Sequence, residues 1–423
     1  METVSEPRKP RVLLAAYQCG PGMGSVSQIG WEWYARVSRR LPTTLITHVR
    51  NQKAIEAAGM APNADIVYVD TEWFAGPLYR LATRLFPKSQ HTVFLLSSLD
   101  FFLFDRQAKR MIQKRMNGGE TWDLIHVVTP LTMAAPTCLH QLQLPLIRGP
   151  LNSGLGVPKA FSSVMKEDSA WLYPMRNISR IIDSMVGSTR HSSMILTATR
   201  ATVEAVPKKY RGKCHSMLEN GVDLSRFTNT PWPSPPSLEN PLNILFVGRL
   251  VPVKGIPFLL KALAQVKGKI PVQARIVGEG PMEEEWKRIA RDCGVADLVY
   301  FLGNRSLDEV AEELRTAHVL CLPSIRESGG AVLLEAMAMS RPVIAVAFGG
   351  PAELVDKGVG EPIEPSGPEA VVNGLARAFT DLVRDPESWR QRGEEGRRRA
   401  EQQYGWEAKV EAAVRLYDRV LGK

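Results

Sequence analysis

The sequence lacks most features that mark secreted, disulfide-bonded or membrane-spanning proteins. Its five cysteines are scattered and odd in number, and none stands in a CxxC pair, so neither a disulfide framework nor a zinc site is expected. This cysteine usage suits a reducing compartment. The first residues, METVSEPRKPR, are polar and contain no apolar signal segment, and no apolar run reaches the roughly 18 residues that span a bilayer. We therefore expect a cytoplasmic protein without a transmembrane segment.

An acidic metal-binding pattern is also missing. No Asp-x-Asp occurs anywhere in the chain, so a metal ion that holds phosphate groups would have no evident carboxylate ligands. We therefore expect neither a metal nor another cofactor. The rest of the composition is that of an ordinary globular protein, with 44% hydrophobic and 23% charged residues among 423, which is long enough for two or more domains.

Positive charge is concentrated in the first half of the chain. Residues 1–225 contain 27 Lys and Arg against 17 Asp and Glu, a net charge of +10, whereas the remainder contains 26 against 27, a net charge of −1. Such a field favours an anionic partner, for example a lipid-phosphate acceptor, an anionic membrane surface or a nucleic acid. No recognisable nucleic-acid-binding module or aromatic platform accompanies the basic residues, so we do not expect a nucleic-acid partner.

One basic segment has two interpretations. Between Leu103 and Met116, apolar residues recur at helical spacing, while Arg and Lys occupy the other faces. Such a helix could lie on an anionic bilayer and hold the protein at the inner face of the membrane. The alternative is an ordinary surface helix whose apolar side packs into the core.

Short apolar runs alternate with helical stretches along the chain, which indicates βαβ units and parallel sheets. In the first half we expect strands at Arg11–Tyr17, Thr43–Val49, Asp65–Val69, Leu124–Val128, Pro145–Arg148 and Ser193–Thr197, with intervening helices that include Leu103–Met116 and Thr132–Gln141. In the second half we expect strands at Leu242–Val247, Val272–Val277, Leu298–Leu302, Val319–Leu322 and Pro342–Val346. A proline-rich segment, Phe227–Pro241, separates the two series and is typical of a linker. The chain is therefore predicted to form two doubly wound, Rossmann-like α/β domains that face each other across a cleft.

A glycine-rich loop follows the first expected strand. Residues Gly20–Ser25 contain Gly22 and Gly24 and precede a helix expected over about Gln28–Arg40. A strand, a glycine-rich loop and a helix can cradle phosphate groups, since backbone N–H groups and partial positive charge gather at a helix N-terminus. The loop is not a clean GxGxxG pattern, so it is a weak motif by itself.

A lone histidine, His126, lies in the expected strand that ends at Thr129. Catalytic side chains often project from the carboxyl ends of such strands. A single histidine is equally well explained as a buried structural residue, and the sequence leaves both interpretations open.

The loop after the first strand of the second half carries two cations between glycines. Residues Val247–Gly255 read VGRLVPVKG, and the glycines allow close approach of a ligand to the backbone. Arg249 can bind two phosphate oxygens with its planar fork, and Lys254 supplies a point charge. Two cations beside the start of a helix favour a diphosphate ligand, and two solvated surface charges are the alternative. A second glycine turn, Val277–Pro281, ends the next strand.

Two glutamates bracket seven residues in the stretch Glu327–Ala338, which reads ESGGAVLLEAMA. The preceding run, Ala317–Pro323, is expected to be a buried strand, and a helix is expected to start near Gly330. Glu327 then lies in the loop at the carboxyl end of a strand. Glu335 lies in the helix among apolar residues, where a buried, unpaired charge would cost several kcal/mol. Glu335 therefore needs partners, and the hydroxyl groups of a ligand are candidates.

Together these motifs resemble those of retaining glycosyltransferases of the GT-B fold, family four type, the glycosyl transferases of group 1. The resemblance rests on VGRLVPVKG, VGEGP, CLPSIRESGGAVLLEAMAMSRPVIA, FGGPAELV and the upstream residues Glu219–Asp223. It continues more weakly into the first half through the glycine loop, DLIHVVTP and Arg148–Gly154. It implies an acceptor-side domain over 1–226, a linker over 227–241, a nucleotide-sugar-binding domain over 242–405 and a last helix, 406–423, that crosses back to the first domain.

The resemblance also implies roles for single residues. Arg249 and Lys254 would bind the donor diphosphate together with the loop that holds Gly22 and Gly24, and would stabilise the leaving group in place of a metal. The sugar would contact Glu327, Ser328, Gly329 and Gly330, the ribose would contact Glu335, and the base would contact Gly278, Glu279, Asn304 and Arg305. The catalytic residues would be Glu327, His126, Arg249 and Lys254.

The expected activity is transfer of a sugar, with retained configuration, from a nucleoside-diphosphate sugar to a hydroxyl of a saccharide, lipid-linked or small-molecule acceptor. This chain departs from the family pattern mainly on the acceptor side, with Ser25-Val26 where Gly-Ser-Glu is frequent and Asn152–Leu155 where Gly-Gly-Gly-Glu is frequent. Gly329 also replaces a more usual aromatic residue. Two alternatives remain compatible with the sequence. An epimerase of nucleotide sugars would need an acid/base pair, and a non-catalytic nucleotide-sugar-binding subunit would need none.

Overall fold

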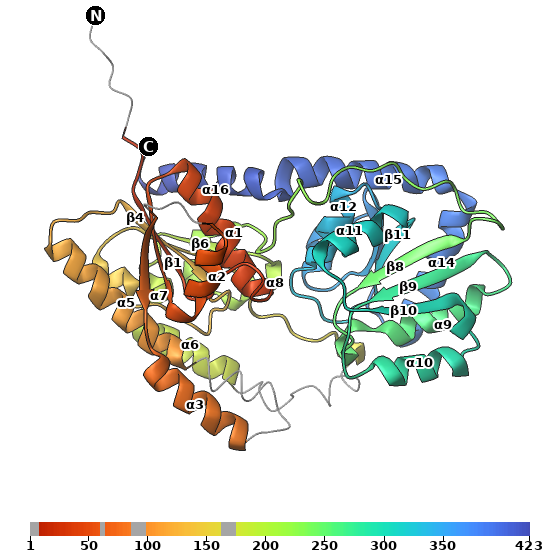
Figure 1. The fold of residues 1–423 in the computed structure, drawn as a ribbon, viewed down its shortest axis with the longest axis horizontal. Helices are drawn as coiled ribbons and strands as arrows, with labels where there is room; N and C mark the ends of the chain where they lie inside the picture. Colours follow the sequence, from red (N-terminus) through yellow and green to blue (C-terminus); the bar gives the residue numbers. More distant parts are fainter. Residues whose placement is uncertain (1–7, 60–63, 86–98, 162–174) are drawn as a thin grey trace, which may run out of the picture. The chain divides into compact units, whose positions relative to one another are not determined.

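The structure is a computed structural model, and it describes residues 8–59, 64–85, 99–161 and 175–423. The chain divides into two compact units (Figure 1). Unit 1 comprises Met1–Gly154, Trp171–Glu219 and Val410–Lys423, and unit 2 comprises Leu155–Ala170 and Asn220–Lys409. Each unit is built on one parallel β-sheet covered by helices, so the expected pair of Rossmann-like α/β domains is confirmed.

The sheet of unit 1 has seven parallel strands in the order β3-β2-β1-β4-β5-β6-β7. Their bounds are β1 Val12–Ala16, β2 Thr43–His48, β3 Asp65–Val69, β4 Leu124–Thr129, β5 Leu146–Leu151, β6 Met194–Thr197 and β7 Cys214–Ser216. All six expected strands are present. Each is a short, largely apolar run, as is typical of parallel strands whose sheet has helices on both faces. Among the described strands of unit 1, only β7 was not predicted, and it is a three-residue edge strand without a fully buried residue.

The helices of unit 1 lie between these strands. They are α1 Ser25–Arg40, α2 Gln52–Ala57, α3 Glu72–Leu85, α5 Asp100–Asn117, α6 Met175–Val186, α7 Ser188–His191 and α8 Arg200–Ala205. The helix expected at Thr132–Gln141 is wrong, since only a 3-10 turn at Leu139–Leu142 forms there. Pro136 interrupts that stretch, and a proline inside a helix removes a backbone donor.

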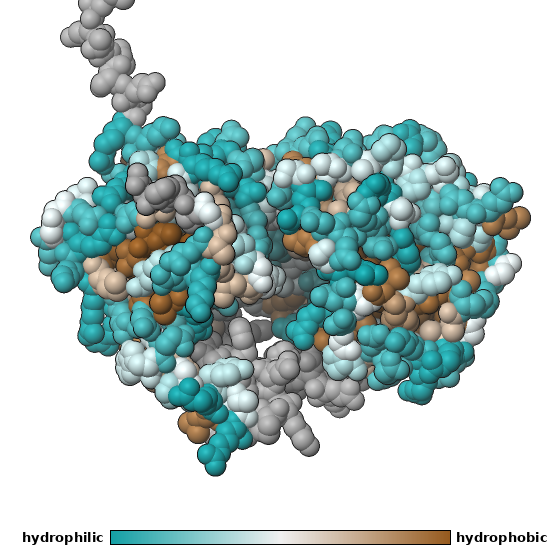
Figure 2. All heavy atoms as spheres, in the orientation of Figure 1, coloured by the Kyte–Doolittle hydropathy of each residue, from teal (hydrophilic) through white to brown (hydrophobic). Residues whose placement is uncertain are grey.

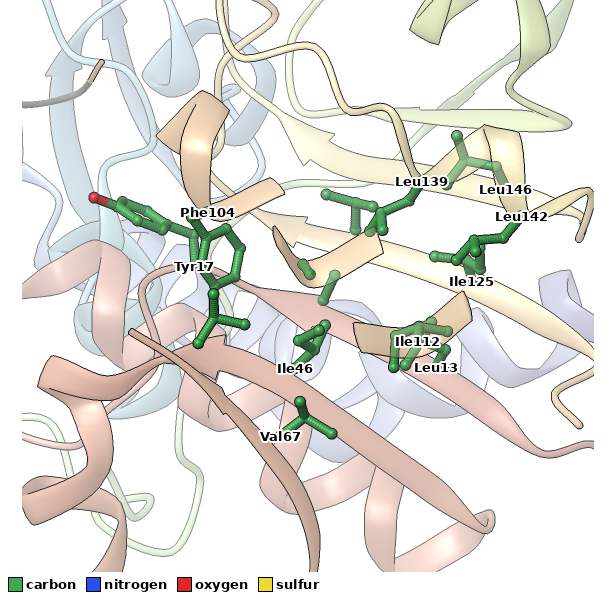
Figure 3. Close-up of a cluster of buried hydrophobic side chains, with 14 of the residues drawn as sticks. Leu13, Tyr17, Ile46, Val67, Phe104, Ile112, Ile125, Leu139, Leu142 and Leu146 are labelled. Carbon is green, nitrogen blue, oxygen red and sulfur yellow. The ribbon is translucent and has the colours of Figure 1, made fainter. Parts of the chain in front are cut away.

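Helix α5 packs its apolar side into the core of unit 1. Phe104 and Ile112 of this helix contact the same buried cluster as Leu13, Ile46 and Ile125 of the sheet (Figure 3). Of the two interpretations of Leu103–Met116, the core-facing surface helix is therefore confirmed. The buried side of this helix cannot lie on a bilayer, although Met111 is 38% exposed.

The sheet of unit 2 has six parallel strands in the order β10-β9-β8-β11-β12-β13. Their bounds are β8 Leu242–Val247, β9 Val272–Val277, β10 Val299–Gly303, β11 Val319–Leu322, β12 Val343–Val346 and β13 Gly360–Ile363. The helices are α9 Ile256–Val266, α10 Glu283–Asp292, α11 Leu307–Thr316, α12 Ala331–Ala338, α13 Gly350–Leu354, α14 Pro368–Arg384 and α15 Pro386–Arg399. Strand β13 was not predicted, and it is an edge strand that contains a glycine and a proline. A Cβ at Gly360 would lie 1.8 Å from the carbonyl oxygen of Val343, so only glycine lets this strand pair with β12.

The proline-rich segment expected as a linker is packed within unit 2. The indole N–H of Trp232 donates to the carbonyl of His318 at 2.9 Å, and the His318 ring binds the carbonyl of Ser234 at 2.8 Å. The buried guanidinium of Arg341 binds the carbonyl of Pro231 at 2.8 Å and the hydroxyl of Thr230 at 2.9 Å. These bonds hold the segment against the end of the sheet.

The chain ends with a short π-helical stretch, Ala400–Tyr404, and helix α16, Trp406–Val420. The first residues of α16 belong to unit 2, and the residues from Val410 onward belong to unit 1. Gly221, which belongs to unit 2, lies so close to the Trp406 ring that a Cβ there would be 2.7 Å from it. This contact explains the glycine in the Glu219–Asp223 motif.

Candidate functional site

The candidate site of unit 2 lies at the carboxyl ends of its parallel strands, where the loops after β8, β9, β10 and β11 carry the predicted residues. Backbone bonds join these loops: Gly248 N–H donates to the Val277 carbonyl at 3.0 Å, and Gly278 N–H donates to the Gly303 carbonyl at 2.7 Å. Gly278 has a φ of 128°, and a Cβ there would lie 2.0 Å from the Gly248 carbonyl oxygen. The glycine turn after β9 therefore supports the loop that carries Arg249.

Lys254 and Glu327 come together although they are 73 residues apart. The lysine ammonium donates a hydrogen bond to the Glu327 carboxylate, and their side chains are only 19% and 14% exposed. Gly255 makes this approach possible: its φ is 66°, and a Cβ would lie 2.2 Å from the Pro323 carbonyl oxygen. Ile325 N–H also donates to the Val253 carbonyl at 2.9 Å, which fixes the two loops to each other.

Arg249 has a different environment. It lies in the loop after β8, is exposed, and forms no ion pair with the residues that the structure describes. Its guanidinium is therefore available to an anionic ligand, while the ammonium of Lys254 is already neutralised by a carboxylate.

The loop from Glu327 to Gly330 leads into helix α12. Gly330 is the N-cap residue, with a φ of 62°, and no side chain caps the helix. Ser328 is exposed, whereas Gly329 and Gly330 are buried. The Glu327 carbonyl accepts a bond from Gly350 N–H at 3.0 Å, so the loop after β12 supports the predicted sugar-binding loop. Although FGGPAELV belongs to the family pattern, sequence reasoning assigned Gly350 no role.

Glu335 lies in the second turn of α12 and is half-buried among apolar neighbours. Burial raises the pKa of its carboxyl group from 4.5 to about 7, and the positive charge of Arg226 offsets part of this rise. Arg226 also pairs with Asp308 at 3.0 Å, so it does not belong to Glu335 alone. A carboxylate with little compensation from the protein is suited to accept hydrogen bonds from ligand hydroxyl groups.

Of the residues predicted to line a base pocket, Gly278, Glu279 and Asn304 are brought together. The Glu279 carboxylate accepts a bond from Asn304 N–H at 3.3 Å, and both residues are exposed. Arg305 instead points toward Glu309, 3.4 Å away.

The predicted glycine-rich loop of unit 1 is accessible. Gly22 and Gly24 are exposed at φ values of 71° and 97°, and Gly24 is the N-cap residue of α1.

His126 has the environment of a core residue. It has no exposed surface and lies within strand β4 of unit 1. Its Nε2 is 2.7 Å from the Gly149 carbonyl oxygen and its Nδ1 is 2.7 Å from the Tyr417 hydroxyl, so both ring nitrogens are occupied. Burial lowers the pKa of the ring to about 4. The catalytic role of His126 stays a prediction that this geometry does not favour.

A buried polar cluster at the carboxyl ends of β1 and β2 was not predicted. The Asp100 carboxylate has no exposed surface and is bound by the Tyr17 hydroxyl and, at 2.7 Å, by the Arg50 guanidinium. Burial, and then the bond to Asp100, raises the pKa of Tyr17. The Arg50 side chain is still 40% exposed and also binds Glu72 at 3.0 Å. Tyr17 directly follows β1, and His48, whose Nε2 is 4.0 Å from the Asp100 carboxylate, ends β2. Polar residues at these two strand ends are the sequence signal that could have pointed to this cluster.

The described residues contain no group of three or more His, Cys, Asp or Glu side chains arranged to hold a metal ion. No helix in the described part of the chain combines the length and the apolar character needed to cross a membrane.

The second half of the chain matches the sequence model of a known family. Residues 232–399 match the model of the glycosyl transferases group 1. An uncharacterized glycosyltransferase of Methanocaldococcus jannaschii is 25% identical over 276 residues, which are 62% of this chain and 68% of that protein. A D-inositol 3-phosphate glycosyltransferase of Geodermatophilus obscurus is 34% identical over 214 residues, 47% of this chain and 45% of that protein. The match thus spans less than half the length of the second relative.

Solved structures resemble the whole chain in fold. A glycosyltransferase from Rickettsia africae has a TM-score of 0.65 at 16% identity, and the match covers 98% of this chain and 99% of that one. HepE from Anabaena, solved in complex with UDP-glucose, has a TM-score of 0.61 at 17% identity, with coverage of 98% and 99%. These neighbours have two Rossmann-like domains, as this chain does. Residues 232–399 are therefore similar to the glycosyl transferases of group 1, and the two Rossmann-like units of the chain have the GT-B fold.

Proposed function

We propose that this protein transfers a sugar from a nucleoside-diphosphate sugar to an acceptor hydroxyl group, with retention of the anomeric configuration and without a protein-bound metal. The observation that carries the proposal is the arrangement in unit 2 of one exposed cation, Arg249, and one carboxylate-paired cation, Lys254. Both lie on joined glycine loops at the carboxyl ends of the strands. The nucleotide-sugar donor is further supported by HepE, which was solved with UDP-glucose.

In this proposal the donor lies along the loops of unit 2. Arg249 and Lys254 bind the diphosphate. The sugar hydroxyl groups bond to Glu327 and to the backbone from Ser328 to Gly330. Glu335 accepts bonds from the ribose, and the accessible surface of Gly278, Glu279, Asn304 and Arg305 contacts the base.

The chemical step breaks the bond between the anomeric carbon and the diphosphate oxygen and forms a bond to the acceptor oxygen. The transition state has oxocarbenium character, and negative charge builds on the departing diphosphate. Arg249 and Lys254 stabilise that charge, which is the largest contribution we assign to the protein. The proton of the acceptor hydroxyl passes to an oxygen of the leaving diphosphate on the same face of the sugar. We assign no protein nucleophile.

Donor turnover tests this function. Wild type, Glu327→Gln, Arg249→Ala and the surface control Arg288→Ala are incubated with UDP-, GDP-, ADP- and dTDP-sugars, and the products are identified by mass spectrometry. We expect slow release of nucleoside diphosphate from one donor by wild type and control, and its loss in the other two variants. Conversion to an isomeric nucleotide sugar would instead identify an epimerase. Donor binding without turnover, even with saccharide and lipid-linked acceptors present, would identify a binding subunit.

We also propose that the protein contacts an anionic membrane surface. Helix α3, and not α5, supports this proposal. Trp73, Tyr79 and Leu81 of this helix are 65%, 55% and 53% exposed. Arg80 and Arg84 are exposed beside them, and the described residues provide no ion pair for either. In Figure 2 the end of unit 1 that carries α3 has hydrophilic and hydrophobic atoms side by side. Exposed aromatic residues beside unpaired arginines suit the interface of an anionic bilayer, where a lipid-linked acceptor would be presented.

A further inference from the structure

The ion pair between Lys254 and Glu327 joins two residues that have separate tasks in the proposed function, one for the diphosphate and one for the sugar. The backbone of both residues is held in place. Lys254 ends a 3-10 turn fixed by the close approach of Gly255 to Pro323, and Glu327 is fixed by the bond from Gly350. The pair is therefore a built feature of the loops after β8 and β11.

This pair changes the charge that a ligand meets. Arg249 contributes one positive charge without a partner among the described residues, whereas the charge of Lys254 is compensated by the carboxylate of Glu327. A diphosphate that binds here must draw Lys254 away from Glu327 or accept the carboxylate as a close neighbour. Both choices disfavour binding, since like charges repel strongly at a partly buried site.

A nucleotide sugar and a free nucleoside diphosphate differ in how they meet this carboxylate. The sugar supplies hydroxyl groups that donate hydrogen bonds to Glu327 and replace the ammonium as its partner. A free nucleoside diphosphate has no such donors, and it leaves the Glu327 carboxylate beside an additional phosphate charge. The two ligands therefore compete unequally for Lys254.

We propose that the Lys254–Glu327 ion pair makes this site discriminate against free nucleoside diphosphate in favour of the nucleotide sugar, and so promotes release of the product. Donor binding exchanges the ion pair for a lysine–diphosphate contact and a carboxylate–sugar contact. Once the sugar has passed to the acceptor, Glu327 draws Lys254 back, and the diphosphate loses one of its two cations. This inference rests on the proposed function and adds a means of product release to it.

Calorimetric titration tests the proposal with the nucleoside diphosphate and the nucleotide sugar that the turnover assay identifies, or with UDP and UDP-glucose as probes. Glu327→Gln and Glu327→Ala remove the carboxylate with and without a polar replacement. Glu369→Gln removes one exposed negative charge elsewhere in unit 2 and is the control. Thermal melting confirms that each variant is folded.

We expect both Glu327 variants to bind the free nucleoside diphosphate about tenfold more tightly than wild type and to bind the nucleotide sugar no better, so that the selectivity ratio falls. The control should leave both affinities unchanged. Unchanged or weaker binding of nucleoside diphosphate by both Glu327 variants, with normal binding of the sugar donor by wild type, would overturn this inference alone. Failure of wild type to bind any nucleotide ligand would overturn the proposed function as well.

Discussion

The hydroxyl group of Tyr417 donates a hydrogen bond of 2.7 Å to Nδ1 of His126, which lies 291 residues earlier in the chain. The direction of this bond follows from the other side of the ring. Nε2 lies 2.7 Å from the Gly149 carbonyl, which can only accept, so Nε2 carries the proton and Nδ1 is the acceptor. A neutral imidazole thus ties the last helix, α16, to the central region of the unit 1 sheet.

Replacement of His126 should therefore lower stability more than it affects catalysis. His126→Ala removes a buried ring and leaves the hydroxyl of Tyr417 unsatisfied, and we expect it to lower the unfolding free energy by about 3 kcal/mol. Tyr417→Phe removes only the hydroxyl and should cost about 1 to 2 kcal/mol. Denaturant unfolding measures both changes, and kcat of the folded His126→Ala enzyme should stay within a factor of a few of wild type. A hundredfold loss of kcat in a fully folded His126 variant would restore the catalytic interpretation.

The positions of the central strands could be predicted because buried parallel strands are short apolar runs. The strands β8, β9 and β11 begin and end at the predicted residues. The edge strands β7 and β13 could not be predicted in this way. An edge strand pairs with a neighbouring strand on one side only, so a polar residue such as His215 or a residue without an N–H group such as Pro362 is tolerated there.

Contacts between residues distant in the sequence could not be predicted from local pattern. Lys254 was predicted to bind the diphosphate and Glu327 the sugar, but their contact with each other was not predicted. Their ion pair depends on how closely Gly255 approaches Pro323. The proline-rich segment has the composition of a linker, and its bonds to Arg341 and His318, which are distant in the sequence, hold it on unit 2. The role of His126 was left open for the same reason, since its partner Tyr417 lies in the last helix.

Removal of Arg249 should reduce donor turnover strongly. Its guanidinium is the exposed cation of the pair, and loss of one preorganised donor to a developing negative charge reduces kcat by about 10²- to 10³-fold. Arg249→Lys should recover part of this loss, because it keeps the charge without the planar fork. Steady-state rates of nucleoside diphosphate release measure the effect, with Arg288→Ala as the control. A similar loss in the control, or none in Arg249→Ala, would place the diphosphate elsewhere.

Charge reversal on helix α3 should weaken binding to anionic vesicles. Each basic residue near such a surface contributes about 1 kcal/mol, so Arg80→Glu combined with Arg84→Glu should reduce vesicle partitioning by at least about tenfold. The matched control reverses Arg106 and Arg110, two exposed arginines of α5. Sedimentation with vesicles of anionic or zwitterionic lipid measures the partitioning at several salt concentrations. A greater loss in the α5 variant, or binding that ignores lipid charge, would contradict the assignment to α3.

Glu335 should make both stability and nucleotide binding depend on pH. Its pKa is raised from 4.5 to about 7 in the folded chain, so the folded state holds the proton more tightly than the unfolded state. The stability that this group contributes is fully present below its unfolded pKa and is lost as pH rises from about 4.5 through 7, by at most about 3 kcal/mol. Glu335→Gln should not show this decline, whereas Glu369→Gln, on an exposed residue, should retain it.

The bound nucleotide should reverse the preference of Glu335 for its protonated form. Bonds from the ribose hydroxyl groups are accepted best by the carboxylate, so nucleotide affinity should rise between pH 5.5 and 7.5, around the raised pKa of about 7. Calorimetry in buffers with different ionisation enthalpies should show proton release on binding to wild type. The terminal phosphate of a nucleoside diphosphate titrates in the same range, so the contribution of Glu335 is the difference between wild type and Glu335→Gln. An identical pH profile in the two proteins would show that Glu335 does not bind the ribose, whatever its effect on stability.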